Sequence, residues 1–207
     1  MEFLKFAVFL SLISVSFAHE PLNSHLLPRP LIIEYPETLG TRSAPDDEIR
    51  LQCTSWRVAV EANNVSPWKT IPEECADYVK EYMAGRGYGV DLERVSSEAL
   101  SFARSVEVQE DGRDVWIFDI DETLLSNLPY YAEHGYGLEV FDNLQFDKWV
   151  ETGKAAAIGP SLRLYEEVCG LGFKVFLMTG RGEKMRCVTV ENLKDAGFQK
   201  WDRLMLR

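Results

Sequence analysis

The stretch from Val115 to Asn127, VWIFDIDETLLSN, decides the fold class of this chain. Its first four residues form a continuous apolar run after the turn residues Asp111-Gly112, which predicts a strand buried on both faces. Asp119 and Asp121 follow that strand directly. Because ligands bind outside the carboxyl ends of parallel strands, these carboxylates are predicted to lie at a ligand site.

The residues after this strand predict a parallel α/β sheet. Apolar runs at 174–178 and 203–206 indicate two more strands, and helical patterns at 160–169 and about 183–196 lie before each of them. Strand, helix, strand, helix, strand indicates right-handed crossovers, with the first two strands adjacent. The second strand ends at Thr179-Gly180-Arg181, which places Thr179 on the same edge as the aspartates.

The paired carboxylates predict a cation site. A helix cap or a turn explains Asp121-Glu122-Thr123 alone, but it does not explain Asp119 abutting a buried strand. Two carboxylates this close repel unless a cation or a proton lies between them. Mg²⁺ takes oxygen ligands, commonly one or two carboxylates together with a substrate phosphate.

Composition narrows the function classes. The 207 residues are 46% hydrophobic and 27% charged, which is typical of a globular chain. A net charge of −11 argues against a nucleic-acid partner, because such a protein needs a basic face to meet phosphates. It does not exclude a phosphorylated substrate at a local cation site.

The N-terminus predicts a secretory signal peptide over residues 1–18. An apolar run from Phe6 to Phe17 ends at small residues, with cleavage expected after Ala18. A membrane anchor is the alternative, but the run is short for a span, so no membrane association is expected once the signal is removed. The expected destination is the vacuole or the cell exterior. Residues 19–44 are proline-rich and predict an extended lead-in.

Residues 45–110 predict a helical region. Three apolar stripes are interpreted as core packing: Ile49, Cys53, Trp56 and Val60; Cys75, Tyr78, Val79, Tyr82 and Met83; Leu92, Val95, Ala99, Phe102 and Val106. Cys53 and Cys75 lie in neighbouring helices, where a disulfide and two buried thiols are both open. Asn64-Val65-Ser66 is a glycosylation sequon.

Two motifs resemble one family. FDIDET (118–123) resembles the first motif of the haloacid dehalogenase-like phosphatases, Asp-x-Asp-x-Thr, and LMTGR (177–181) resembles their second. The longer strings DIDETLLSNLPYY and FLMTGR are similar to the plant class B acid phosphatases and the related vegetative storage proteins. The likeness covers nearly the whole chain, and it implies a three-layer parallel-sheet fold with N-terminal helices and a small cap.

The resemblance implies roles for the motif residues. Asp119 would attack phosphorus, and Asp121 would protonate the leaving alcohol and then activate water. The Asp119 carboxylate and the backbone carbonyl of Asp121 would ligate Mg²⁺. Substrate binding is assigned to three residues, Thr123, Thr179 and Gly180. Arg181 can face the substrate or pair at the surface, and we favour the surface.

The segment 126–159 lies where relatives insert the cap that selects substrate. Its aromatic residues, Tyr130, Tyr131, Tyr136, Phe141, Phe146 and Trp149, are interpreted mainly as the cap's own core. Tyr130 and Tyr131 lie nearest the first motif and are the best candidates for substrate contacts. His134 alone does not indicate a metal ligand.

Relatives carry a third motif with a lysine and a fourth with aspartates, both after the strand that begins at Arg203. The sequence ends at Arg207, so we expect the core at 111–207 to be incomplete, as a fragment, a truncated isoform or an early-terminated reading of a longer gene. The lysine of the third motif is an electrostatic stabiliser, and losing a group of this type costs on the order of 10²–10³-fold in rate. Weak or undetectable turnover is therefore expected of these 207 residues.

Two function classes remain. One is an acid phosphatase that hydrolyses a small phosphate monoester with Mg²⁺. The other is a vegetative storage protein, an amino-acid reserve with little or no catalysis. Storage members of the family can lack the nucleophilic aspartate, so an intact Asp119 favours the enzyme. A homodimer is compatible with either function.

Overall fold

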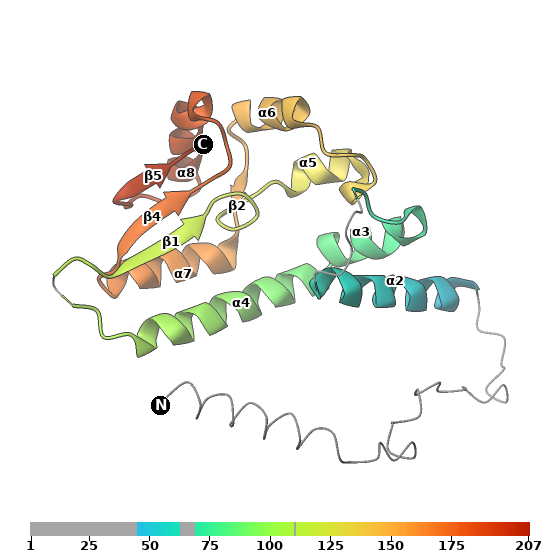
Figure 1. Ribbon diagram of the computed structural model, residues 1–207, viewed down its shortest axis with the longest axis horizontal. Coiled ribbons are helices and arrows are strands. Elements are labelled where there is room, and N and C mark those ends of the chain that lie inside the picture. Colours follow the sequence, from blue (N-terminus) through green and yellow to red (C-terminus); the bar gives the residue numbers. More distant parts are fainter. Residues whose placement is uncertain (1–44, 63–68, 110) are drawn as a thin grey trace, which may run out of the picture. The chain divides into compact units, whose positions relative to one another are not determined.

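The computed structural model describes residues 45–62, 69–109 and 111–207 (Figure 1). The predicted signal peptide with its cleavage after Ala18, the lead-in and the sequon at Asn64 lie outside the described residues. Within them, no helix is both long and apolar enough to cross a membrane. The elements, in chain order, are α2 (Pro45–Glu61), η2 (Glu73–Cys75), α3 (Ala76–Ala84), α4 (Arg86–Ser105), β1 (Val115–Asp119), β2 (Leu125–Ser126), α5 (Leu128–Glu133), η3 (Gly135–Gly137), α6 (Asn143–Glu151), β3 (Ala156–Ala157), α7 (Gly159–Gly170), β4 (Lys174–Met178), η4 (Glu183–Met185), α8 (Arg186–Asp195) and β5 (Arg203–Met205).

Three parallel strands form the main sheet in the order β1-β4-β5. In its register Asp119 lies opposite Met178, and Met178 lies opposite Met205. The three strands therefore end together, as Figure 1 shows for the arrows of β1 and β4. The prediction of a parallel α/β sheet with its first two strands adjacent is confirmed.

The helices of the core cover one face of this sheet. Phe118 and Leu177 point to that face, where they share a buried cluster with Val168 of α7 and Leu193 of α8. Strand order here follows chain order, and successive right-handed crossovers in one direction put both crossover helices on the same face. The described residues thus supply the sheet and the helices of one face.

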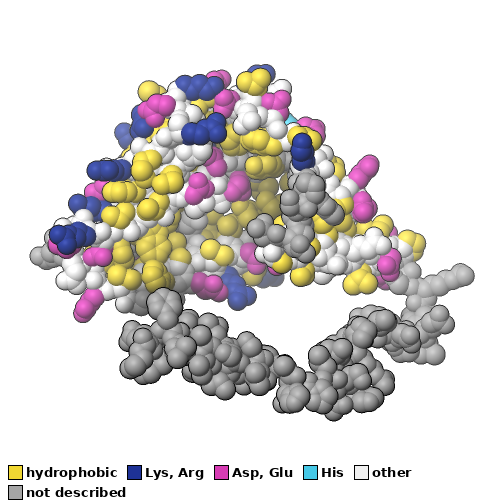
Figure 2. All heavy atoms as spheres, viewed as in Figure 1, with side chains coloured by type: hydrophobic (Ala, Val, Ile, Leu, Met, Phe, Trp, Pro, Cys, Tyr) yellow, Lys and Arg dark blue, Asp and Glu magenta, His cyan; other side chains and the backbone are white. Residues whose placement is uncertain are grey.

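The opposite face of β1 corrects one expectation. We predicted a strand buried on both faces, but Ile117 is 54% exposed and Val115 is also exposed. Met178 on β4 is exposed as well, and Figure 2 shows hydrophobic side chains gathered over the strands. The apolar run in β1 therefore marks a strand for which the described residues cover only one face.

The apolar stripe predicted on α4 is also partly wrong. Val95 and Phe102 are both 64% exposed, whereas Ala103 is fully buried and Ala99 packs against the core. α4 lies along α7, and small alanines let two helices approach closely. The buried face of α4 is therefore rotated away from its largest side chains. Ile49 and Val60 of α2, also expected in a core, are exposed.

A disulfide bond joins Cys53 in α2 to Cys75 in η2. Both cysteines are buried, and this bond settles the choice between a disulfide and two free thiols. The bond fixes α2 to the start of α3 across the undescribed residues 63–68.

We expect loss of this disulfide to destabilise the protein. The two cysteines are 22 residues apart, and closing a loop of that length in the unfolded chain is worth about 3 kcal/mol. Urea unfolding of the C53A/C75A double variant should show a loss of that order. The matched control is C169A, which removes a free thiol that is only half buried. An equal loss in both variants would show that the bond adds nothing to stability.

Candidate active site

The end of β1 presents two carboxylates on one side of the chain. Side chains alternate in an extended segment, so Ile120 points into the core, where it is fully buried, while Asp119 and Asp121 both point out of it. The Ile120 carbonyl then accepts the backbone N–H groups of Thr123, Leu124 and Leu125 at 3.3, 2.9 and 2.9 Å. This tight turn holds both aspartates at the edge of the sheet.

Asp119 is exposed and lightly held. The Thr123 hydroxyl donates to Asp119 Oδ2 at 2.9 Å, which restrains the carboxylate from one side. Thr123, assigned above to substrate binding, therefore contacts Asp119 in this structure. A carboxylate that is exposed and held through one oxygen keeps its other oxygen available for chemistry.

Asp121 is held much more firmly, because three side chains donate hydrogen bonds to it. Thr179 Oγ1 lies 2.9 Å from Oδ2, and Asn127 Nδ2 lies 3.0 Å from Oδ1. Arg181 donates from Nη2 to Oδ1 at 2.7 Å and from Nε to both oxygens at 3.1 and 3.2 Å. Residues from the segments after β1 and after β4 thus meet at one carboxylate.

The position of Arg181 corrects another expectation. We favoured a surface position, but its side chain is 2% exposed and lies beside the Asp121 side chain, which is 24% exposed. Its remaining nitrogen, Nη1, donates to Thr189 Oγ1 at 3.2 Å. The spacing held a signal that we missed: alternation after a strand puts Arg181 on the same side as Thr179. A guanidinium buried this deeply needs an anionic partner, and Asp121 is that partner.

Thr179 and Gly180 lie at the predicted edge. Thr179 is buried, and its backbone N–H donates to the Met205 carbonyl at 3.0 Å. Its hydroxyl donates to Asp121 and accepts from the Arg181 backbone N–H at 3.1 Å. Gly180 is exposed, with open space where a side chain would project. Its backbone is therefore accessible from solvent.

A hydrogen-bonded chain beside Asp121 was not predicted. Glu122 adopts a positive φ of 56°, and its side chain accepts the backbone N–H of Asn127, five residues further along the chain. Its other oxygen accepts the Tyr88 hydroxyl from α4 at 2.8 Å. Burial, and then this hydrogen bond, raise the pKa of Tyr88, so the hydroxyl stays a donor. α4 thereby supports the motif loop directly.

The segment between β2 and β3 is bounded by these two short strands, which pair with each other. Leu125 pairs with Ala157 and Ser126 pairs with Ala156 in an antiparallel ladder. Between these strands lie α5, η3 and α6. The assignment of this segment as a cap over the site stays a prediction.

The aromatic residues of this segment divide into two groups. Tyr130 is 4% exposed and stacks on His134 at 4.1 Å between ring centroids, with Phe146 at 5.2 Å. It therefore belongs to the segment's own core. Tyr131 is half buried, and its pKa is raised by burial and then by the nearby Glu122 carboxylate. Of the two tyrosines proposed for substrate contact, Tyr131 is the one that lies beside the first motif.

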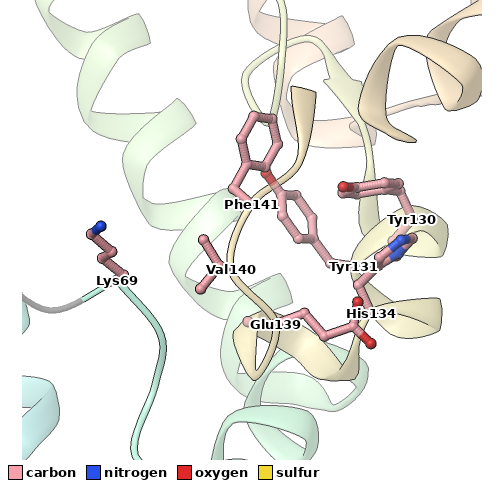
Figure 3. Close-up of a pocket in the computed structure, with 8 residues that line it drawn as sticks. Lys69, Tyr130, Tyr131, His134, Glu139, Val140 and Phe141 are labelled. Carbon is pink, nitrogen blue, oxygen red and sulfur yellow. The ribbon is translucent and has the colours of Figure 1, made fainter. Parts of the chain in front are cut away.

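A pocket of about 320 Å³ opens beside these tyrosines. Figure 3 shows Tyr131 and Phe141 close together on one wall, with Tyr130 and His134 on another and Lys69 farther off. Its lining residues are Lys69, Tyr130, Tyr131, His134, Gly137, Glu139, Val140 and Phe141. The pocket is thus largely aromatic, with single charges of either sign at its rim.

The available oxygen ligands fit Mg²⁺ when it is shared with a phosphate. In the described ranges, no group of three or more His, Cys, Asp or Glu residues is arranged to hold a metal ion. The Asp119 carboxylate is exposed, whereas the Asp121 side-chain oxygens are occupied by donors. The family resemblance adds the backbone carbonyl of Asp121, in the loop after β1, as the second protein ligand. Mg²⁺ commonly takes one or two protein oxygens together with phosphate and water.

Comparison with known proteins identifies the family. The sequence model for subfamily IIIB of the HAD superfamily, the acid phosphatases, matches residues 40–207. The chain therefore belongs to this subfamily, and the resemblance described above is confirmed.

The relatives include both classes that the sequence left open. "Acid phosphatase 1" of Solanum lycopersicum is 64% identical over 200 residues, covering 97% of this chain and 76% of that protein. "Stem 28 kDa glycoprotein" of Glycine max is 43% identical over 157 residues, covering 76% and 61%. "Vegetative storage protein 1" of Arabidopsis thaliana is 38% identical over 157 residues, covering 75% and 58%. The chain thus spans three quarters of the tomato relative and about three fifths of the others.

A solved structure supports the fold alone. The class C acid phosphatase from Bacillus anthracis superposes with a TM-score of 0.53 at 16% identity, covering 64% of this chain and 57% of that chain. The HAD-like fold is therefore confirmed from both sequence and structure.

We expect the Arg181–Asp121 pair to contribute more to stability than a surface pair. R181M keeps much of the side-chain volume but leaves a partly buried carboxylate without its cation, at a cost of about 1–3 kcal/mol. The control R104M breaks the exposed Arg104–Glu167 pair, for which about 0–1 kcal/mol is expected. Urea unfolding measures both.

A double-mutant cycle separates the pair from packing. Adding D121N to R181M removes the stranded charge and should recover part of the loss. If the two substitutions were simply additive, the ion pair would not be the source of the stability.

Proposed function

We propose that this protein is an acid phosphatase that hydrolyses phosphate monoesters through an aspartyl-phosphate on Asp119. The observation that carries the proposal is the contrast between its two carboxylates. Asp119 is exposed and held through one oxygen, as a nucleophile requires, whereas Asp121 is fixed beside it by three donor side chains. Such pairs with distinct surroundings divide nucleophile and acid–base roles.

In the first step, an oxygen of Asp119 attacks phosphorus and the bond from phosphorus to the ester oxygen breaks. Asp121, which enters this step in its protonated form, gives its proton to the departing alkoxide, so the alcohol leaves neutral. In the second step, Asp121 takes a proton from water, and that water attacks the phosphoryl group. Phosphate leaves, and the Asp119 carboxylate is restored.

Residues around the two aspartates would position the phosphoryl group. The Thr179 hydroxyl can rotate from Asp121 toward a phosphoryl oxygen, and the exposed backbone at Gly180 can donate to another. Thr123 keeps Asp119 turned toward the substrate. Asp119 and the Asp121 backbone carbonyl would hold Mg²⁺, which offsets the negative charge of the phosphate when it is bound.

The aromatic pocket is the candidate site for the organic part of the ester. Tyr131 lines that pocket, and its pKa is raised by burial and then by the charge of Glu122 in the motif loop. Tyr131 therefore lies between the pocket and the motif loop. We also propose, from the signal-like residues 1–18, that the protein enters the secretory pathway for the vacuole or the cell exterior.

A storage role is the second candidate function. A relative named as a vegetative storage protein is 38% identical over 157 residues, which favours a shared fold without requiring shared catalysis. An intact Asp119 at the strand end favours the enzyme. Turnover separates the two functions.

We predict Mg²⁺-dependent hydrolysis of p-nitrophenyl phosphate that Asp119→Asn abolishes, because the amide lacks the nucleophile's charge. Asp121→Asn should lower kcat by on the order of 10²–10⁴-fold. Asp195→Asn, an exposed aspartate at the end of α8, is the matched control and should leave turnover unchanged. Excess chelator should remove the activity, and added Mg²⁺ should restore it.

The assay is run on the 207-residue chain and on the same chain extended with the part of the tomato relative that the match does not cover. We expect robust turnover of the extended protein and weak turnover of the shorter one. Full activity in Asp119→Asn would remove the nucleophile assignment. An inactive extended wild type would favour the storage function.

A further inference from the structure

The side chain of Asn127 does not make the hydrogen bonds that are usual at its position before a helix. It is the residue before α5, where an asparagine side chain usually accepts the first N–H groups of the helix. Here the side chain makes no capping bond to α5, a helix that the structure describes in full. Asn127 is 1% exposed, so its amide must find partners inside the protein.

Those partners lie on opposite sides of the amide. Asn127 Nδ2 donates to Asp121 Oδ1 at 3.0 Å, and Asn127 Oδ1 accepts the indole N–H of Trp149 at 2.8 Å. Trp149 belongs to α6, 22 residues along the chain. The amide therefore bridges the first motif and α6. This helix belongs to the inserted segment, the residues between β2 and β3.

The chemistry of the two partners allows one orientation of this amide. An indole nitrogen can only donate, so the amide oxygen must face Trp149. The amide NH₂ then faces Asp121, whose carboxylate can only accept. Turning the amide over would place oxygen against oxygen and nitrogen against nitrogen, so the Trp149 indole N–H and both polar atoms of the buried amide would lose these partners.

We propose that Asn127 and Trp149 are positioning residues that tie the orientation of the Asp121 carboxylate to the placement of α6. Trp149 fixes the orientation of the amide, and the amide holds Oδ1 of Asp121 while Thr179 holds Oδ2. The inserted segment then has a role besides the predicted cap, because its docking completes the set of donors around Asp121. This inference rests on the proposed acid–base role of Asp121.

The backbone of Asn127 strengthens the bridge. Its N–H donates to Glu122, and its carbonyl accepts the N–H of Tyr131 at 3.1 Å. Glu122 belongs to the motif loop and Tyr131 belongs to α5, so Asn127 cannot shift without moving one of these segments. We call the hydrogen-bonded series Trp149–Asn127–Asp121 the relay. Its central residue, Asn127, is held by its own backbone hydrogen bonds.

The first arm of the test compares two leaving groups. p-Nitrophenolate leaves readily without a proton, whereas phenolate needs the acid more, so a misplaced Asp121 should harm phenyl phosphate selectively. We expect Trp149→Phe to lower kcat for phenyl phosphate about five-fold and for p-nitrophenyl phosphate less than about two-fold, the effect of one lost hydrogen bond. KM should stay within about two-fold for both substrates, since no substrate contact is removed.

Two further variants frame this result. Asn127→Asp keeps an acceptor for Trp149 but sets a like charge against Asp121, and should show a larger selective loss. Trp201→Phe is the matched control, because Trp201 packs against the core just before the start of β5, whereas Asp121 and Asn127 follow the end of β1. It should leave both substrates unaffected. Equal losses for both substrates in Trp149→Phe, or none, would overturn the positioning role.

The second arm needs no turnover and uses the 207-residue chain. Hydrogen exchange of the Trp149 indole N–H, followed by NMR and assigned by its disappearance in Trp149→Phe, should be slowed in the wild type. Asp121→Ala frees the amide of Asn127 and should speed that exchange at least about ten-fold. Exchange that is fast in the wild type, or unchanged in Asp121→Ala, would overturn the relay. A protected indole in the 207-residue chain, together with no turnover of the extended protein, would contradict the phosphatase function and leave the Trp149–Asn127–Asp121 contact supported.

Discussion

The buried ion pair between Arg181 and Asp121 is the constraint on which the site depends. Arg181 follows β4 and Asp121 follows β1, so the pair joins the ends of two neighbouring strands. A guanidinium that is almost fully buried cannot be left without an anion, because the cost of an uncompensated charge there is high. Asp121 is therefore held at the edge of the sheet by the same interaction that makes burial of Arg181 possible.

This constraint explains why two aspartates one residue apart have different surroundings. Asp121 receives donors from Arg181, Thr179 and Asn127, whereas Asp119 receives one hydroxyl from Thr123. A carboxylate with many donors is fixed in place, and one with few can move toward an electrophile. The division of labour that we propose for the two aspartates thus rests on the different hydrogen bonds of each residue, with both on one extended segment.

The supports of the site come from segments far apart in the chain. Tyr88 on α4 holds Glu122, and Trp149 on α6 holds Asn127. These two contacts bring the N-terminal helices and the inserted segment to the loop after β1. Such a loop can keep Glu122 at a positive φ because its side chain is bonded at both oxygens.

Much of the fold was determined by the sequence alone. The strands at Val115 and Lys174, their parallel pairing and the meeting of Asp119, Asp121 and Thr179 follow from apolar runs and from the geometry of parallel sheets. These features depend on local pattern and on rules that hold for every such sheet. The tertiary structure alone decided that Arg181 is buried, that Cys53 bonds Cys75, and that α4 buries alanines while Phe102 stays exposed. It also decided that Asn127 bridges Asp121 and Trp149. Each of these outcomes depends on which side chain arrives from a distant element, and a local pattern carries no record of that partner.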